Sequence, residues 1–74
     1  MPGRLRDIVR ALGKLGIDVV KPNKGSHWKA VRRSDGKTYP LPAHNGEKTE
    51  LDNKYIRGLC NCFDLDEAAL RRLM

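Results

Sequence analysis

The sequence predicts a single α+β domain in which helices cover one face of a three-stranded antiparallel sheet. Three observations support this: a helical apolar pattern near the N-terminus, three β-prone segments separated by turn residues, and a second helical pattern after residue 50. The expected order is helix, three strands, helix (α-β-β-β-α) and a short C-terminal helix. The 74 residues are enough for one domain, 1–74, with a small core.

The first helix is predicted over residues 4–15. Apolar side chains recur there at helical spacing, at Leu5, Ile8, Val9, Leu12 and Leu15. Gly16 follows directly, and glycine is the residue that most often ends a helix in the left-handed conformation. We therefore expect the helix to stop at Gly16.

Three β-prone segments follow, at residues 17–21, 26–33 and 37–41. The Pro-Asn-Lys-Gly run at 22–25 predicts a turn between the first two. Asp35-Gly36 between the second and third predicts a tight hairpin. Pro40 cannot donate a ladder hydrogen bond, so the third strand should be short or lie at a sheet edge.

The remainder of the chain is predicted to be a loop and two helices. Residues 42–50 are polar, and a helix is expected over about 51–62 with Leu51, Tyr55, Ile56 and Leu59 facing inward. Asp64, followed three residues later by Glu67, resembles a capping box. A last short helix is therefore expected over about 65–73.

The charge of the chain is unevenly distributed. Residues 1–40 contain ten basic and three acidic residues, a net of +7, whereas residues 41–74 contain five basic and six acidic residues, a net of −1. A basic surface with few aromatic residues suits a phosphate-bearing partner better than an apolar one. The composition thus favours a nucleic acid as the partner. The alternative is a basic protein that carries this net charge without binding a nucleic acid.

Several other classes of protein do not fit the sequence. No apolar run approaches the ~18 residues that a membrane span needs, and residues 1–7 do not resemble a secretory signal. Cys60 and Cys62 are too few for a disulfide-rich secreted domain. Their spacing on a helix would direct the thiols apart, which argues against a zinc site with His27 and His44. We therefore expect a cytoplasmic protein without a metal or a cofactor.

The alternation of side chains along a strand predicts the location of His27. Trp28 is the only tryptophan and should choose the core. His27, Lys29 and Arg33 then share the opposite, solvent-facing side of the sheet. The alternative is an exposed Trp28 that stacks on a nucleic-acid base, with His27 in the core.

The segment Gly25-Ser26-His27 resembles the Gly-Ser-His signature of the HicA-type mRNA interferase toxins, the YcfA-like family. The segments 38–44, ending in Pro-Ala-His, and 55–59 follow the order of that family's strand and second helix. The resemblance implies a fold like that of double-stranded-RNA-binding domains. It also implies cleavage of mRNA by the signature histidine, and a HicB-like antitoxin protein as partner.

The residues around this segment have the chemistry that RNA cleavage requires. RNA carries its own nucleophile, the 2′-hydroxyl, and a histidine with an ordinary pKa of about 6.5 can act as general base or acid near neutral pH. Cations stabilise the developing negative charge, and glycine lets the backbone approach a phosphate. The expected catalytic residue is His27, and the expected RNA-binding residues are Lys24, Gly25, Ser26, Lys29 and Arg33.

The role of His44 and two alternative functions of the chain remain open at this point. His44 is either the complementary acid or base, or a loop histidine with a local hydrogen bond. A non-catalytic RNA-binding module of the same fold is a second function, but its usual lysine cluster would fall at residues 51–54, which carry mixed charge. A third is an inactive toxin relative that acts as a protein-interaction module and is indifferent to substitution of His27.

Overall fold

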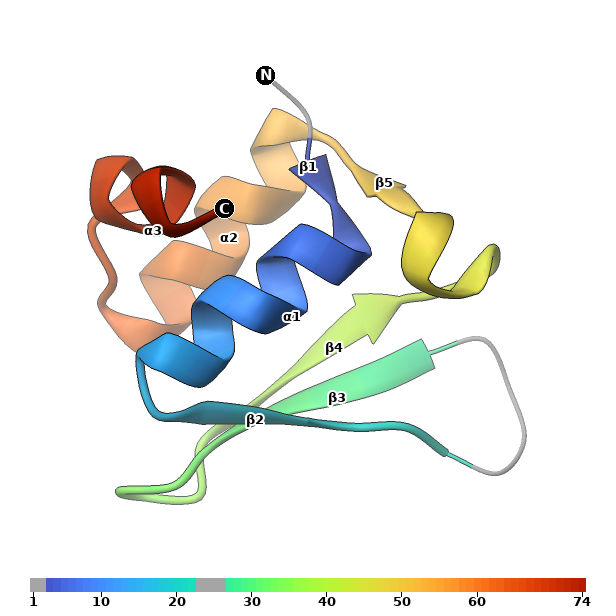
Figure 1. Cartoon of the computed structure of the whole chain (residues 1–74). Helices are drawn as coiled ribbons and strands as arrows, with labels where there is room; N and C mark the ends of the chain where they lie inside the picture. Colours follow the sequence, from blue (N-terminus) through green and yellow to red (C-terminus); the bar gives the residue numbers. More distant parts are fainter. Residues whose placement is uncertain (1–2, 23–26) are drawn as a thin grey trace.

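The computed structural model describes residues 3–22 and 27–74 and confirms the predicted α+β architecture (Figure 1). In chain order the elements are β1 (Gly3–Arg4), α1 (Leu5–Lys14), β2 (Ile17–Val20), β3 (His27–Arg32), β4 (Thr38–Pro42), the 3₁₀ turn η1 (Gly46–Lys48), β5 (Glu50–Leu51), α2 (Asn53–Phe63) and α3 (Glu67–Leu73). The three long strands and three helices occur where the sequence predicts them, with ends that differ by one or two residues.

Strands β2, β3 and β4 form an antiparallel sheet in that order. Ala30 of β3 lies opposite Val19 of β2 and Tyr39 of β4. Strand β4 is at an edge, where Pro40, which lacks an N–H, is tolerated. The β3–β4 turn contains Gly36 with φ of 73°, a left-handed conformation that suits glycine in a tight turn. The predicted hairpin and the edge position of the proline are both confirmed.

All three helices lie on one side of this sheet (Figure 1). On the face toward the helices, Ile17, Ala30 and Leu41 are buried. They pack with apolar residues of the helices, chiefly Leu5, Ile8, Leu12, Ile56, Leu59, Phe63 and Leu70. The other face of the sheet is not covered by a helix, so strand side chains directed there meet solvent.

The helix ends follow from local chemistry. Gly16 has φ of 81° just after α1, as predicted. The Asp52 carboxylate accepts a hydrogen bond of 2.7 Å from the Tyr55 N–H and so caps α2. No helix within the described ranges combines the length and the apolar character needed to cross a membrane.

The predicted capping box of Asp64 and Glu67 is wrong. Asp64 instead ends α2 in the left-handed conformation, with φ of 55°, which aspartate tolerates better than most residues. The residue that caps α3 is Asp66, whose carboxylate accepts from the Ala68 N–H at 3.1 Å. The last helix consequently begins at Glu67, two residues later than expected.

The segment predicted as a polar loop over residues 42–50 is more ordered than its composition indicates. It contains η1 and leads into β5, which pairs with β1 so that Arg4 lies opposite Glu50. Thr49, which directly precedes β5, is completely buried. Its carbonyl accepts from the Leu5 N–H at 2.7 Å, and its hydroxyl accepts from the Asn45 N–H at 2.9 Å. These bonds hold the segment against the start of α1.

Candidate functional site

His27 is the first residue of β3, and its side chain is exposed. The next residue, Trp28, is half-buried and packs against the core from the helix side of the sheet. Successive strand side chains point to opposite faces, so His27 lies on the face that no helix covers. The structure therefore has the arrangement that the alternation predicts and contradicts the alternative with His27 in the core.

The neighbours of His27 on the open face are a cation and several apolar residues. Lys29 is exposed on the same face, about 6.6 Å along the strand. Pro42 of β4 lies directly opposite His27, and Lys29 is flanked by Val20 and Pro40. An imidazole beside an ammonium group on an open surface is accessible to a large anionic substrate.

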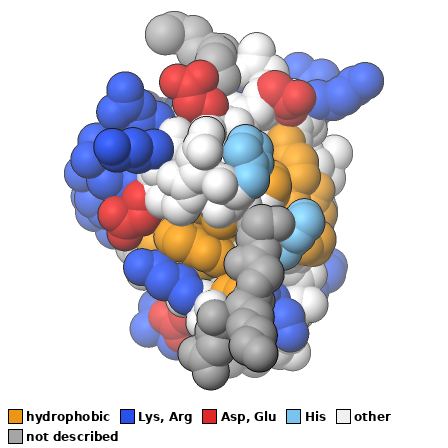
Figure 2. Space-filling model, turned by 90° about the vertical axis from the view of Figure 1, so that its right-hand side faces the viewer, with side chains coloured by type: hydrophobic (Ala, Val, Ile, Leu, Met, Phe, Trp, Pro, Cys, Tyr) orange, Lys and Arg blue, Asp and Glu red, His pale blue; other side chains and the backbone are white. Residues whose placement is uncertain are grey.

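His44 lies at the same end of the molecule as His27. The chain leaves β4 at Pro42, opposite His27, and reaches His44 two residues later. The two Cα atoms are therefore at most about 12 Å apart. Figure 2 shows histidine side chains together on this face, beside a strip of hydrophobic residues. The structure thus brings the two histidines to one surface.

Next to His44 the surface is hollowed into two adjoining cavities of about 530 and 460 Å3. Both are lined by Arg4, Asn45 and Lys48. His44 and Glu50 complete the first, and Arg6 and Glu47 complete the second. We call the combined hollow the α1–η1 cleft. It was not predicted from the sequence because Arg4 and Lys48 are brought together by the β1–β5 pairing, for which the sequence carries no pattern.

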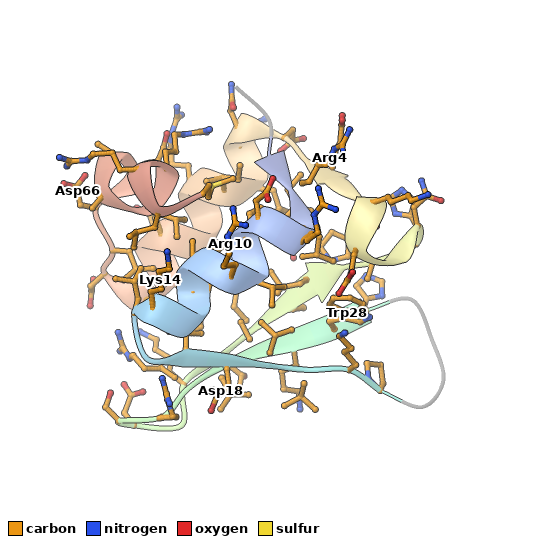
Figure 3. The ribbon with its side chains drawn as sticks, viewed as in Figure 1. Arg4, Arg10, Lys14, Asp18, Trp28 and Asp66 are labelled. Carbon is orange, nitrogen blue, oxygen red and sulfur yellow. The ribbon has the colours of Figure 1, made fainter. Side chains whose placement is uncertain are left out.

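A chain of contacts through Lys21 connects η1 to β3. The Lys21 ammonium lies 4.8 Å from the centre of the Trp28 ring and 3.6 Å from a carboxylate oxygen of Glu47. Figure 3 shows Trp28 on the helix side of β3, near η1. The ion pair is exposed and contributes little stability. Together the two contacts connect the end of β2, the start of β3 and the turn that follows His44.

Arg33, predicted to contact RNA beside His27, lies at the other end of the sheet. It is six residues from His27, about 20 Å along an extended strand. Its guanidinium donates to the carbonyls of Gly16 and Gly13, at 3.3 and 3.4 Å, and lies 3.7 Å from the Asp18 carboxylate. A cation at the C-terminal carbonyls of a helix is stabilising there. The structure does not bring Arg33 together with His27.

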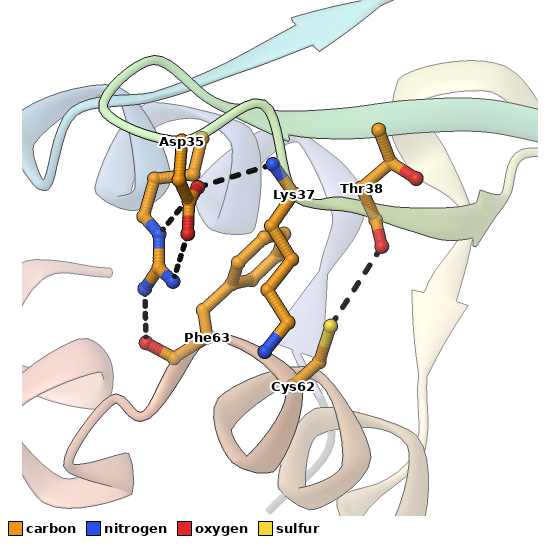
Figure 4. A network of polar contacts seen from close by, with 6 residues as sticks. Asp35, Lys37, Thr38, Cys62 and Phe63 are labelled. Carbon is orange, nitrogen blue, oxygen red and sulfur yellow. Dashed lines mark hydrogen bonds and ion pairs between the residues drawn. The ribbon is translucent and has the colours of Figure 1, made fainter.

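Arg32 joins the same end of the sheet to α2, in a network with the residues Asp35, Lys37 and Phe63 that Figure 4 labels. Its guanidinium donates to both carboxylate oxygens of Asp35, at 3.1 and 2.7 Å, and to the Phe63 carbonyl at 2.7 Å. The Lys37 N–H also donates to Asp35, at 3.1 Å. The hydrogen bond from Arg32, followed by that from Lys37, lowers the pKa of Asp35 to about 2. This network holds the β3–β4 turn against the end of α2.

The low pKa of Asp35 predicts how stability changes in acid. An unfolded aspartate titrates at about 3.9, so Asp35 stabilises the fold above that pH, and this stabilisation is lost as the pH falls toward 2. We expect Asp35→Asn to be less stable than wild type at about pH 6, with a difference that shrinks at about pH 2.5. Urea unfolding midpoints at the two pH values measure this. An equal difference at both would contradict the assignment.

Three of the predicted site residues, Lys24, Gly25 and Ser26, lie outside the described residues. The two cysteines lie in α2. Cys60 is buried, and burial raises the pKa of its thiol. The Cys62 thiol donates to the Thr38 carbonyl at 3.7 Å (Figure 4). Among the residues that the structure describes, no three His, Cys, Asp or Glu side chains gather as metal ligands would.

The site has to be interpreted from its own chemistry. No family model matches the chain, and comparisons with curated proteins and with solved structures return no match. The described residues offer two exposed histidines, one of them beside a lysine on an open sheet face and the other in a cleft with cationic walls. These groups can exchange protons with, and attract, an anionic substrate.

Proposed function

We propose that the chain is a metal-independent RNA endonuclease in which His27 transfers a proton. The observation that carries the proposal is the exposed position of His27 on the open face of the sheet, with Lys29 on the same face and His44 at the same end. A net charge of +6 favours a phosphate-bearing substrate. The resemblance of Gly25-Ser26-His27 to the HicA-type signature supports the same activity.

The proposed reaction uses the ribose of the substrate as nucleophile. A base removes the proton of the 2′-hydroxyl as the 2′-oxygen forms a bond to phosphorus. The bond from phosphorus to the 5′-oxygen breaks, and an acid gives that oxygen a proton. The products are a 2′,3′-cyclic phosphate and a free 5′-hydroxyl, and no external oxidant, water or metal is needed.

His27 and Lys29 have distinct roles in this reaction. His27 supplies one of the two proton transfers, a contribution typically worth about 10²- to 10⁴-fold in rate. Lys29 stabilises the negative charge that develops on the phosphate oxygens. His44 is our candidate for the other proton transfer because it lies at the same end of the molecule. Lys24, Gly25 and Ser26 are proposed to contact the same phosphate.

The resemblance also supports a biological setting for the reaction. We propose a toxin of a type II toxin–antitoxin system that cleaves mRNA in the cytoplasm. A cognate HicB-like antitoxin protein would restrain it by covering the open sheet face. Expression of the chain alone in a bacterium should then arrest growth, and co-expression of the protein from the adjacent reading frame should relieve the arrest.

The mechanism predicts that RNA cleavage persists when divalent metal ions are removed. Purified chain is incubated with an end-labelled, single-stranded RNA of mixed sequence, with and without excess EDTA. We expect equal rates under both conditions and products that carry 2′,3′-cyclic phosphate ends. The matched control is the same strand with 2′-deoxyribose throughout, which lacks the nucleophile and should stay intact.

Three outcomes would contradict the proposal. Cleavage that stops in EDTA and returns with magnesium would mean that a metal, and not a histidine pair, drives the reaction. Binding of RNA without any cleavage would instead identify a non-catalytic RNA-binding module. An interaction module that is an inactive relative would neither bind nor cut the RNA.

A further inference from the structure

We infer that the α1–η1 cleft binds a backbone phosphate of the RNA, one that flanks the phosphodiester cut at His27. The inference rests on the proposed function for the ligand being an RNA strand. The contact between the cleft and a phosphate is inferred from the cleft itself. The inference assigns a second RNA-binding site, formed by Arg4, Arg6 and Lys48, none of which belongs to the expected acid–base centre. Its ligand is a phosphodiester group.

The charges on the cleft walls favour an anion. Arg4, Arg6 and Lys48 supply three positive charges. Of the two carboxylates, Glu47 is paired with Lys21 at 3.6 Å, so its charge is offset. Glu50 lies opposite Arg4 in the β1–β5 pair. Of the two acidic residues that line the cleft, Glu50 is the one without an ion pair among the described residues. Three cations against one such carboxylate leave the cleft attractive to phosphate.

The size and lining of the cleft point to a polar ligand. Each of its two parts lies within the range of about 300–1,000 Å3 that small-ligand sites occupy. Such sites are mostly apolar, whereas all of the residues that line this cleft are polar or charged. Guanidinium groups match the geometry of phosphate oxygens, and the lysine ammonium contacts phosphate oxygens as a point charge.

The location of the cleft connects it to His27. His44 lies on its wall, two residues after Pro42, which is opposite His27. A strand whose scissile phosphate lies at His27 and Lys29 would pass His44 and then meet Arg4 and Lys48. The turn that carries Lys48 is held by the buried Thr49, so the cleft is largely formed before RNA binds.

The test measures RNA binding separately from RNA cleavage. In a His27→Ala background, which keeps the RNA intact, a fluorescent single-stranded RNA is titrated with chains that carry Arg4→Gln and Lys48→Gln together. We expect Kd to rise about tenfold or more. The slope of log Kd against log salt should fall by about 0.7 for each phosphate that the protein no longer neutralises. Circular dichroism and thermal unfolding verify that the variants fold.

Two further variants make the test specific to the cleft. Lys14→Gln removes one positive charge at the opposite end of α1 (Figure 3), against two in the double variant, and should leave RNA binding unchanged. Glu50→Gln removes the carboxylate opposite Arg4 and should lower Kd, an effect of opposite sign. In chains with His27 intact, Arg4→Gln with Lys48→Gln should raise KM by more than it lowers kcat, because the two side chains contact a flanking phosphate and neither transfers a proton.

The results separate this inference from the proposed function. If the chain cuts RNA through His27 but the Arg4 and Lys48 variants bind it as tightly as Lys14→Gln does, the cleft is not a phosphate site and the inference is overturned. If the chain does not cut RNA but its RNA binding depends on Arg4, Lys48 and Glu50 as described, the endonuclease proposal fails and the phosphate site stands.

Discussion

Substitution of His27 by alanine is expected to reduce RNA cleavage by at least about 100-fold, because one of two proton transfers is lost. The side chain is exposed on the open sheet face and packs against little. Its removal should therefore change the free energy of unfolding by no more than about 0.5 kcal/mol. Single-turnover cleavage of labelled RNA, measured beside urea unfolding of the same variant, gives both quantities.

A rescue experiment separates chemistry from positioning. In His27→Gly the missing group can be supplied from solution, so added imidazole should restore part of the cleavage rate, whereas it should not raise the rate of wild type. His44→Ala, tested in the same assay, distinguishes a partner in proton transfer, which would lose about as much rate, from a loop histidine, which would lose little. A His27→Ala chain that cleaves RNA at the wild-type rate would refute the mechanism.

The fold was predictable where local patterns determine it. The helical spacing of Leu5, Ile8 and Leu12 fixes α1, and Gly16 fixes its end through a left-handed conformation. Asp35-Gly36 fixes the β3–β4 hairpin, and its prediction is confirmed. In each case the decisive interaction joins residues that are close in sequence.

Features that depend on distant residues escaped prediction. The β1–β5 ladder has two residues in each strand, too few for an alternating pattern. It is adjoined by a hydrogen bond from the Leu5 N–H to the Thr49 carbonyl, which also joins residues distant in sequence. The sequence pattern assigns the cap of α3 to Asp64, whereas the structure has Asp66 there, for a related reason. Two aspartates with the same local preference lie close together, and only the packing of the chain decides which one ends α2.

The candidate site also contains features that local patterns predict and features that depend on distant residues. The outward direction of His27 and Lys29 follows from one assumption, the burial of Trp28, because strand geometry then determines the rest. Alternation assigns Arg33 to the open face, but the rise of an extended strand already puts it about 20 Å from His27. Its bonds to the carbonyls at the end of α1 join residues that are distant in sequence and have no local pattern. The role of His27 in RNA cleavage stays a prediction until it is measured.

The largest loss of stability is expected from Phe63→Ala. The predicted second helix stopped at residue 62, yet Phe63 is its last residue and is almost completely buried. Its ring centre lies 6.4 Å from that of Tyr39 and 5.6 Å from the Arg32 guanidinium carbon. Truncation of a buried phenylalanine costs about 3–5 kcal/mol, a large part of the total of about 4–11 kcal/mol expected for a domain of this length. Urea unfolding followed by the fluorescence of Trp28 measures the loss.

Phe63→Leu is the matched control for this prediction. Leucine keeps most of the buried apolar volume and removes the two ring contacts, so it should cost less than half as much as alanine. The Arg32 bond to the backbone carbonyl of residue 63 can persist in both variants, because it does not involve the side chain. Equal destabilisation by alanine and leucine would mean that the ring contacts with Tyr39 and Arg32, and not the filled volume, hold α2 against the sheet. An unchanged midpoint in Phe63→Ala would place the end of α2 outside the cooperative core.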